Sequence, residues 1–266
     1  MGAIKSATAT YLRIYGKYKF RLVTDIVWIM VNVLTFAFMG GVIEPKAGTI
    51  NYSFTEFFMV GILFWTFFEA PYINTVMIVP EEAGNGTLGI LYTNGVTPFR
   101  VMVSQMLSST LINVLLALFV VFPIIVFVGA INIYSLSYPL LLLLVPVLVV
   151  CWFFMMAVGI IFGSLALLVK KLGGTAGVVV QGLKIASGFF FPIVGFPTII
   201  QPIVEKIPIT IGLSMTRDIL ILKTVSNVLD NMFWLCSGTI FIFLLSYAIY
   251  MSAERKARLL GNIESY

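Results

Sequence analysis

Six long apolar runs fill most of this 266-residue chain, and they limit the folds open to it. A helix needs about 20 mostly apolar residues to cross a bilayer, and inside lipid its backbone must satisfy its own hydrogen bonds. The alternating segments of about 10 residues typical of a membrane β-barrel are missing. We therefore expect an all-α polytopic membrane protein, a single transmembrane domain over 1–266 with six transmembrane helices. The expected spans are 22–43, 54–79, 101–128, 138–169, 175–191 and 231–251. The third is expected to bend at Pro123, and the fourth, which is long for one crossing, is expected to tilt or protrude.

The composition excludes several functional classes. Hydrophobic residues make up 60% of the chain and charged residues 10%, whereas ordinary globular proteins carry about 25% charge. Histidine, the commonest general base and metal ligand, is absent, and the three aspartates lie far apart. No G-x-x-x-x-G-K-S/T motif offers a P-loop for ATP. We therefore expect no catalytic residues, no metal site and no cofactor bound by this chain. An intramembrane transferase is disfavoured for the same reasons.

Two segments outside the long runs have their own character. Residues 1–21 combine five basic residues with Tyr11, Tyr15 and Tyr18 at helical spacing, which predicts an amphipathic helix lying in the membrane interface. Residues 192–230 contain four prolines, and the apolar stretches between them are too short to span. This pattern predicts short re-entrant or outer helices that dip into the membrane edge or pack over the other spans.

Basic residues are distributed unequally between the two sides of the predicted topology, and this asymmetry sets the orientation. With the N-terminus inside, eleven Lys and Arg residues are cytoplasmic and four are outside, while Lys184 lies within a span. Both termini, the tail 252–266 and the loop 79–100 are then cytoplasmic, in a multi-pass protein of the cell membrane. We interpret the net charge of +5 as topology and expect no nucleic-acid partner. The four outer residues are Lys46, Lys206, Arg217 and Lys223.

The loop 79–100 is the most polar interruption between two long runs. Pro80, Glu81 and Glu82 suit the first turn of a helix, because proline fixes φ there and acids favour the positive end of the dipole. A short helical piece over 88–92 is bracketed by Gly84 and Gly86 on one side and by Asn94 and Gly95 on the other, residues that tolerate positive φ. A short capped helix between two spans predicts a docking surface, although it could also be a simple connector.

The motifs in this loop and in the proline-rich segment form a recognisable layout. Residues 82–91 read Glu-Ala-Gly-Asn-Gly-Thr-Leu-Gly-Ile-Leu and are followed by Thr97-Pro98, while the outer segment offers Phe191-Pro192, Phe196-Pro197, the step Ile207-Pro208-Ile209-Thr210, and Arg217. With the interfacial helix and six spans, this resembles the membrane (permease) subunits of type-two ATP-binding-cassette (ABC) exporters. The chain departs from that pattern at Gly84 and Gly89, where relatives often have acids, and in the longer spacing from Leu91 to Pro98.

The resemblance implies a permease subunit that forms a homo- or heterodimer and works with two copies of a separate ATPase subunit, which would bind ATP and Mg²⁺. It implies that the loop between spans two and three is the coupling helix. Glu81 and Glu82 would contact the ATPase, and Thr87, Leu88 and Leu91 would supply capping and a hydrophobic key. The alternative is an energy-independent channel or secondary transporter. The expected coupling residues are Glu81, Glu82, Gly86, Thr87, Leu88 and Leu91.

Two charged residues lie inside expected spans. Glu69 is in the middle of span two, just before Pro71, and Lys184 is near the middle of span five. An unpaired charge there costs roughly 3 kcal/mol on insertion scales, so we expect both to face the protein interior. They could line a translocation path or form a buried structural ion pair, and the sequence leaves both readings open.

Overall fold

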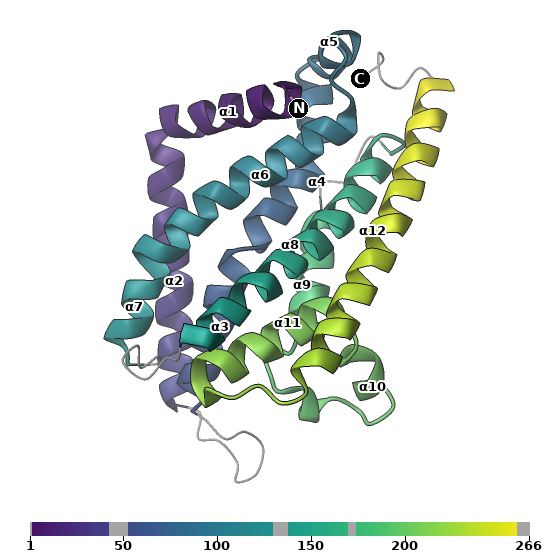
Figure 1. The fold of residues 1–266 in the computed structure, drawn as a ribbon. Helices are drawn as coiled ribbons and strands as arrows, with labels where there is room; N and C mark the ends of the chain where they lie inside the picture. The colour runs from purple at the N-terminus through teal and green to yellow at the C-terminus, as the bar shows by residue number, and fades with distance from the viewer. Residues whose placement is uncertain (1, 43–52, 130–137, 170–173, 260–266) are drawn as a thin grey trace.

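The computed structural model describes residues 2–42, 53–129, 138–169 and 174–259, and every regular element in these ranges is helical. Figure 1 shows long helices running side by side, with a short helix, α1, lying across one end. Five described segments are long and apolar enough to cross a membrane, which confirms the all-α, multi-pass class. They are Leu22–Val42, Phe54–Gly84, Pro98–Phe127, Tyr138–Ala166 and Val228–Leu259.

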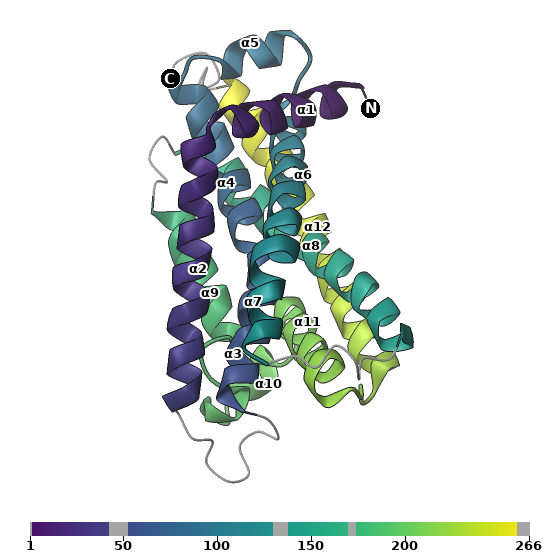
Figure 2. The ribbon, with the colours of Figure 1, turned by 90° about the vertical axis from the view of Figure 1, so that its left-hand side faces the viewer.

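The N-terminal helix α1 (Gly2–Lys17) is separated from the first spanning helix, α2 (Lys19–Val42), by a single residue, Tyr18. The two helices meet at a steep angle, so that α1 extends away from the axis of α2 (Figures 1 and 2). The α1 helix packs along the start of α6 (Pro98–Leu116), where the Thr8 hydroxyl reaches the carbonyl of Ser104 at 3.5 Å. The expected helix at 1–21 is thus present, and it ends at Lys17.

The second span is split into α3 (Phe54–Thr66) and α4 (Glu69–Gly84). Pro71 explains the break, because its ring would clash with the carbonyl four residues earlier, at Phe67, in a continuous helix. In α4 Pro71 occupies the first turn, where no backbone donor is needed. Sequence analysis placed an unbroken span here and did not predict this break.

The third span contains a wide turn where a bend was expected. It is composed of α6, a π-helical turn η1 (Ala117–Val121) and α7 (Phe122–Phe127), and the Phe122 N–H bonds the carbonyl of Ala117. The wide turn immediately precedes Pro123. It makes room for the proline ring, which a regular α-helix cannot accommodate. The third span is thus irregular next to the proline at which a bend was expected.

The longest helices, α8 (Tyr138–Ala166) and α12 (Val228–Leu259), pack against each other. At 1.5 Å per residue the 29 residues of α8 extend about 43 Å, longer than a hydrocarbon core of about 30 Å. Both views show α8 oblique to α2, which agrees with the expected tilt (Figures 1 and 2). The close approach of α8 to α4 requires small residues, since a Cβ at Gly159 would lie 3.1 Å from the Thr75 side chain.

The expected span 175–191 is only partly helical. Its helix, α9 (Thr175–Ala186), has 12 residues and is too short by itself to cross a bilayer. The chain then turns at Gly188, which has φ +72°. Beyond this turn the chain is not helical through Phe191.

The proline-rich segment contains the expected short helices, at the end opposite α1 (Figure 1). The largest of them, α11, packs against α8, α12 and α3. The four elements are η3 (Ile193–Gly195), α10 (Gln201–Val204), α11 (Pro208–Arg217) and the π-helical η4 (Asp218–Leu222).

One charged residue of this segment, Arg217, is buried. Sequence analysis placed it on the outer side of the membrane and did not predict its burial, but it is 5% exposed. Its guanidinium lies 3.6 Å from the ring centre of Phe57 and donates to the carbonyl of Gly188 at 3.0 Å. A guanidinium is tolerated in such a place because an aromatic face and backbone carbonyls replace its water. Arg217 therefore joins α11 to α3 and to the turn after α9.

Candidate functional site

The loop expected to dock a partner starts differently from the prediction. Pro80, Glu81 and Glu82 do not open a short helix but lie in the last turns of α4, so the expectation that they form a first turn was wrong. The helix continues through Pro80 because its inner face stays packed, with Val79 buried before the proline and Ala83 buried after it. The chain leaves α4 only after Gly84.

A six-residue helix, α5 (Leu88–Thr93), follows and confirms the short helix expected in this loop. Gly86 and Gly95 bracket it at φ +69° and +76°, conformations that a side chain would strain. We expected Thr87 to cap α5, but its side chain makes no capping hydrogen bond. Its hydroxyl instead donates to the carbonyl of Glu82 at 3.0 Å and to the Glu82 carboxylate, so it ties the loop back to α4.

The short helix is anchored to the C-terminal end of α12. The Tyr92 hydroxyl donates to Glu254 Oε1 at 3.4 Å, and Arg258 Nη2 donates to the same oxygen at 2.7 Å. The Arg258 guanidinium also lies 5.2 Å from the centre of the Tyr92 ring. Sequence analysis did not connect these residues. The sequence could have predicted the Glu254–Arg258 pair, because these residues are four apart on one helix face.

Two apolar side chains of α5, Leu88 and Ile90, differ in exposure. Leu88 is 2% exposed and packs in the core of this chain, while Ile90 is 62% exposed. Leu91 is half-buried. Leu88, which we expected as part of a hydrophobic key, is therefore occupied within its own subunit, and Ile90 is the outward apolar side chain that sequence analysis missed.

The N-terminal helix contacts the same loop. The Tyr11 hydroxyl donates to Glu82 Oε1 at 3.0 Å. Burial, followed by the negative charge of Glu82, raises the pKa of Tyr11, so the hydroxyl keeps its proton and remains a donor. Glu82 thus receives bonds from α1 and from Thr87, whereas Glu81 is exposed. Of the two carboxylates, Glu81 is the one on the surface.

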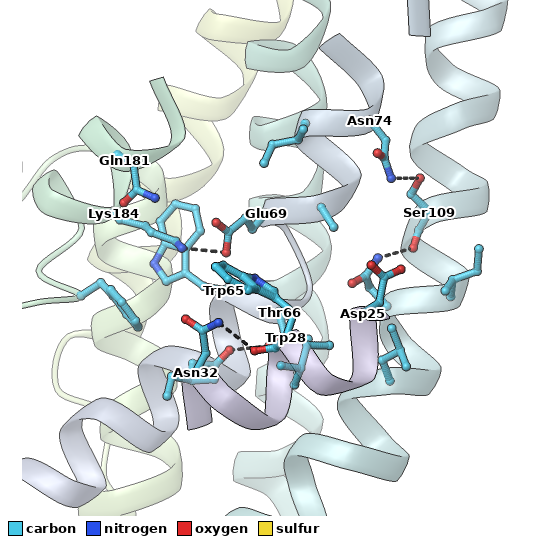
Figure 3. A pocket seen from close by; sticks show the side chains of 18 of the residues that line it. Asp25, Trp28, Asn32, Trp65, Thr66, Glu69, Asn74, Ser109, Gln181 and Lys184 are labelled. Atoms are coloured by element: carbon cyan, nitrogen blue, oxygen red, sulfur yellow. Dashed lines mark hydrogen bonds and ion pairs between the residues drawn. The ribbon is translucent and has the colours of Figure 1, made fainter. Parts of the chain in front are cut away.

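A second candidate site lies among the spans. A cavity of about 410 Å³ opens between α2, α3, α4, α6 and α9, and Figure 3 shows its polar side chains converging from these helices. The lining is mixed, with aromatic rings, three charged side chains and neutral amides and hydroxyls. The charged residues are Asp25, Glu69 and Lys184, and the aromatic residues are Tyr15, Trp28, Phe36, Trp65, Phe189 and Phe190.

Glu69 and Lys184 form an ion pair at this cavity, with 2.7 Å between Oε2 and Nζ (Figure 3). Glu69 is the first residue of α4, and Lys184 is in the last turn of α9. Each charge therefore lies at the helix end whose dipole favours it. A hydrogen bond of 3.2 Å from Trp65 Nε1 to Ser187 Oγ runs beside the pair and joins α3 to the same end of α9.

One face of α2 completes the cavity. Asp25, Trp28, Asn32 and Phe36 recur at helical spacing and all line it. The Tyr15 hydroxyl donates to the Asp25 carboxylate from α1. Sequence analysis did not identify Asp25 as a lining residue, although the spacing of these four residues could have indicated it.

These features define a class: a polytopic helical membrane protein with a short helix fixed at one end of its spans and a polar cavity between them. A family model described as ABC-2 type transporter matches residues 3–221. This match covers most of the chain, and the chain belongs to the ABC-2 type transporter family. It is therefore a membrane permease component of an ABC transporter, and the resemblance found in the sequence is confirmed. A comparison with curated proteins found no match.

Proposed function

We propose that this chain is the permease subunit of an ATP-driven exporter in the cell membrane. It works as a dimer with a second permease subunit, and two ATPase subunits supply ATP and Mg²⁺ binding. In this proposal α5 is the coupling helix, and the end bearing α1, α5 and the C-terminal part of α12 is cytoplasmic. Most of the described basic residues that we expected in the cytoplasm belong to helices at this end, which supports the orientation (Figure 1).

The observation that carries the proposal is the outward position of Ile90 on an anchored helix. A helix of six residues is not stable by itself in water. The contacts of Leu88 with the core and of Tyr92 with Glu254 and Arg258 therefore hold α5 in place. A partner that pushes on Ile90 and on the exposed Glu81 of α4 moves α4 and α12 with it. An anchored helix with an outward apolar residue, in a loop that also has an exposed carboxylate, suits a groove on another subunit.

The route from α5 into the membrane follows α4. This helix runs from the coupling end to Glu69, directly after the break at Phe67 and Phe68. A movement of α4 is then taken up at the break and reaches α9 through the Glu69–Lys184 pair. The pair thus links the ATPase end of the molecule to the cavity between the spans.

The remaining segments have roles in the same proposal. We assign α1 to the cytoplasmic membrane interface, 192–230 to the outer side and 252–266 to a cytoplasmic tail. The 12 residues of α9 extend about 18 Å, and the non-helical residues 187–191, which include the turn at Gly188, follow in the same segment. Together they complete the sixth crossing. The turns at Lys46 and at Lys170 and Lys171 lie outside the described residues.

The proposal is tested by purifying the tagged full-length chain from native membranes in a mild detergent and measuring ATP hydrolysis in the eluate. We expect wild type to recover an ATPase and Ile90→Asp to recover at least tenfold less, because a carboxylate in an apolar contact costs about 2 kcal/mol or more. Ile199→Asp is the matched control, since Ile199 is 85% exposed at the opposite end. Equal recovery with Ile90→Asp and wild type would contradict the assignment of α5.

A further inference from the structure

The cavity between the spans has the size and lining of a small-molecule site. Its volume of about 410 Å³ lies within the range of roughly 300–1,000 Å³ for ligand pockets. Of its charged side chains, two are carboxylates and one is an ammonium. Among the lining residues that the structure describes, Lys184 is the only cation, and Glu69 already neutralises it.

Lys184 itself shows how this cavity holds a cation. Its Nζ contacts the Glu69 carboxylate at 2.7 Å and lies 5.8 Å from the ring centre of Trp65 and 5.6 Å from that of Phe189. A carboxylate and aromatic faces within about 6 Å are the groups that stabilise a positive charge outside water. The side chain is buried, so these contacts take the place of hydration.

The facing wall on α2 repeats this combination. Asp25 and Trp28 are three residues apart on one helix, so the carboxylate and the indole share a face. Phe36 lies on the same face and contacts Phe189 and Phe190, with 5.3 Å and 6.2 Å between ring centres. The first set of a carboxylate and aromatic rings surrounds Lys184. This second set faces the open volume of the cavity.

We propose that the cavity binds organic cations with aromatic groups, and that Asp25 and Trp28 are the residues that select them. The inference rests on the proposed function, since the cation is taken as the exported substrate. A ring of the ligand packs against Trp28 and Phe36, and its positive charge faces Asp25. The amides of Asn32 and Asn74 line the same volume and give polar contacts without adding charge. An organic anion is rejected because its charge would face Asp25, while the one cation of the described lining is already paired with Glu69.

Tetraphenylphosphonium and tetraphenylborate test the inference, because they share four phenyl rings and differ in the sign of the charge. Each is equilibrated separately by dialysis against the isolated full-length chain in lipid nanodiscs, with empty nanodiscs subtracted for partitioning into lipid. We expect saturable binding of tetraphenylphosphonium, at least tenfold tighter than that of tetraphenylborate. Equal affinities for the two ions would overturn the proposal.

Two variants locate the site. Asp25→Asn keeps the size of the side chain and should weaken tetraphenylphosphonium binding about tenfold by removing one nearby opposite charge. Asp230→Asn is the control, since Asp230 lies at the start of α12 and is not part of the lining. Should Asp25→Asn fail to fold, Trp28→Leu replaces it, because the 67% exposed Trp28 is a tolerant position. Unchanged affinity in the folded variant would overturn the assignment.

The outcome is separable from that of the proposed function, because the dialysis contains no ATPase. Recovered ATPase activity without charge-selective binding would overturn this inference alone. Charge-selective binding that depends on Asp25, in a chain that recovers no ATPase, would contradict the proposed function and support the binding site.

Discussion

The carboxylate of Glu69 lies 2.7 Å from the ammonium of Lys184, and this contact joins two helices at the points where each is interrupted. Glu69 follows the break in the second span, and Lys184 precedes the turn at Gly188. The side chain of Lys184 is 11% exposed and that of Glu69 is 31% exposed, so the pair is only partly screened by solvent. Its loss therefore has consequences for stability as well as for movement.

Removing one partner of this pair should be worse than removing both. Glu69→Gln leaves the Lys184 ammonium without its carboxylate and should cost about 2 kcal/mol, less than the 3–5 kcal/mol typical of fully buried pairs. The double variant Glu69→Gln/Lys184→Met leaves no charge behind and should recover most of this loss. Thermal unfolding of the purified chain in detergent measures both. A double variant as unstable as the worse single variant would contradict the account.

Tyr11→Phe should loosen the loop that α1 holds. The substitution removes a hydrogen bond to a carboxylate, worth about 1.5–3 kcal/mol, while keeping the ring in place. Amide hydrogen exchange of residues 81–87 should accelerate by about tenfold or more. Tyr18→Phe is the control, because Tyr18 is 64% exposed in the link between α1 and α2. Identical exchange in the Tyr11 and Tyr18 variants would show that α1 does not support this loop.

Arg217→Lys should destabilise the chain although the charge is kept. A lysine cannot stack a planar group on Phe57 and offers different donor geometry to the carbonyl of Gly188. We expect a loss of about 2 kcal/mol in the free energy of unfolding. Lys206→Met serves as the control, since Lys206 is exposed and its contact with Trp234 is worth less than about 1 kcal/mol. Equal stability of the two variants would contradict the role assigned to Arg217.

Membrane orientation is tested with cysteines at the two ends of the molecule. In a Cys236→Ala background, where the remaining Cys151 is buried, Ile90→Cys and Ile199→Cys place exposed thiols at opposite ends. A maleimide that does not cross membranes should label position 199 in intact cells and position 90 only after the cells are opened. The reverse pattern would invert the proposed topology, and labelling of both from outside would contradict it.

The sequence predicted the fold where a local rule was sufficient. Long apolar runs gave the spanning helices, and Gly86 and Gly95 marked the two ends of α5 because positive φ is a local property. The same kind of rule predicted a bend at Pro123, where the structure has a π-helical turn just before the proline. These features depend on a residue and its immediate neighbours along the chain.

The sequence could not predict which way side chains face in apolar helices. Leu88 and Ile90 have similar hydrophobicity, and only the contacts of α5 with the rest of the chain turn one inward and the other outward. The burial of Arg217 was not predicted because its aromatic partner, Phe57, is 160 residues away along the chain. The sequence contains a proline at positions 71 and 80, but the helix is interrupted before Pro71 and continues through Pro80. Tertiary packing decides between these outcomes.

The central claim, that α5 is where an ATPase subunit acts on this chain, is tested most directly by photo-crosslinking from position 90. A benzophenone amino acid replaces Ile90 in the full-length protein in native membranes, and mass spectrometry identifies the adduct. The account predicts a crosslink to a protein that carries a G-x-x-x-x-G-K-S/T motif, with no such adduct when the same group replaces Ile199. Adducts at position 90 confined to lipid or to copies of this chain would contradict it.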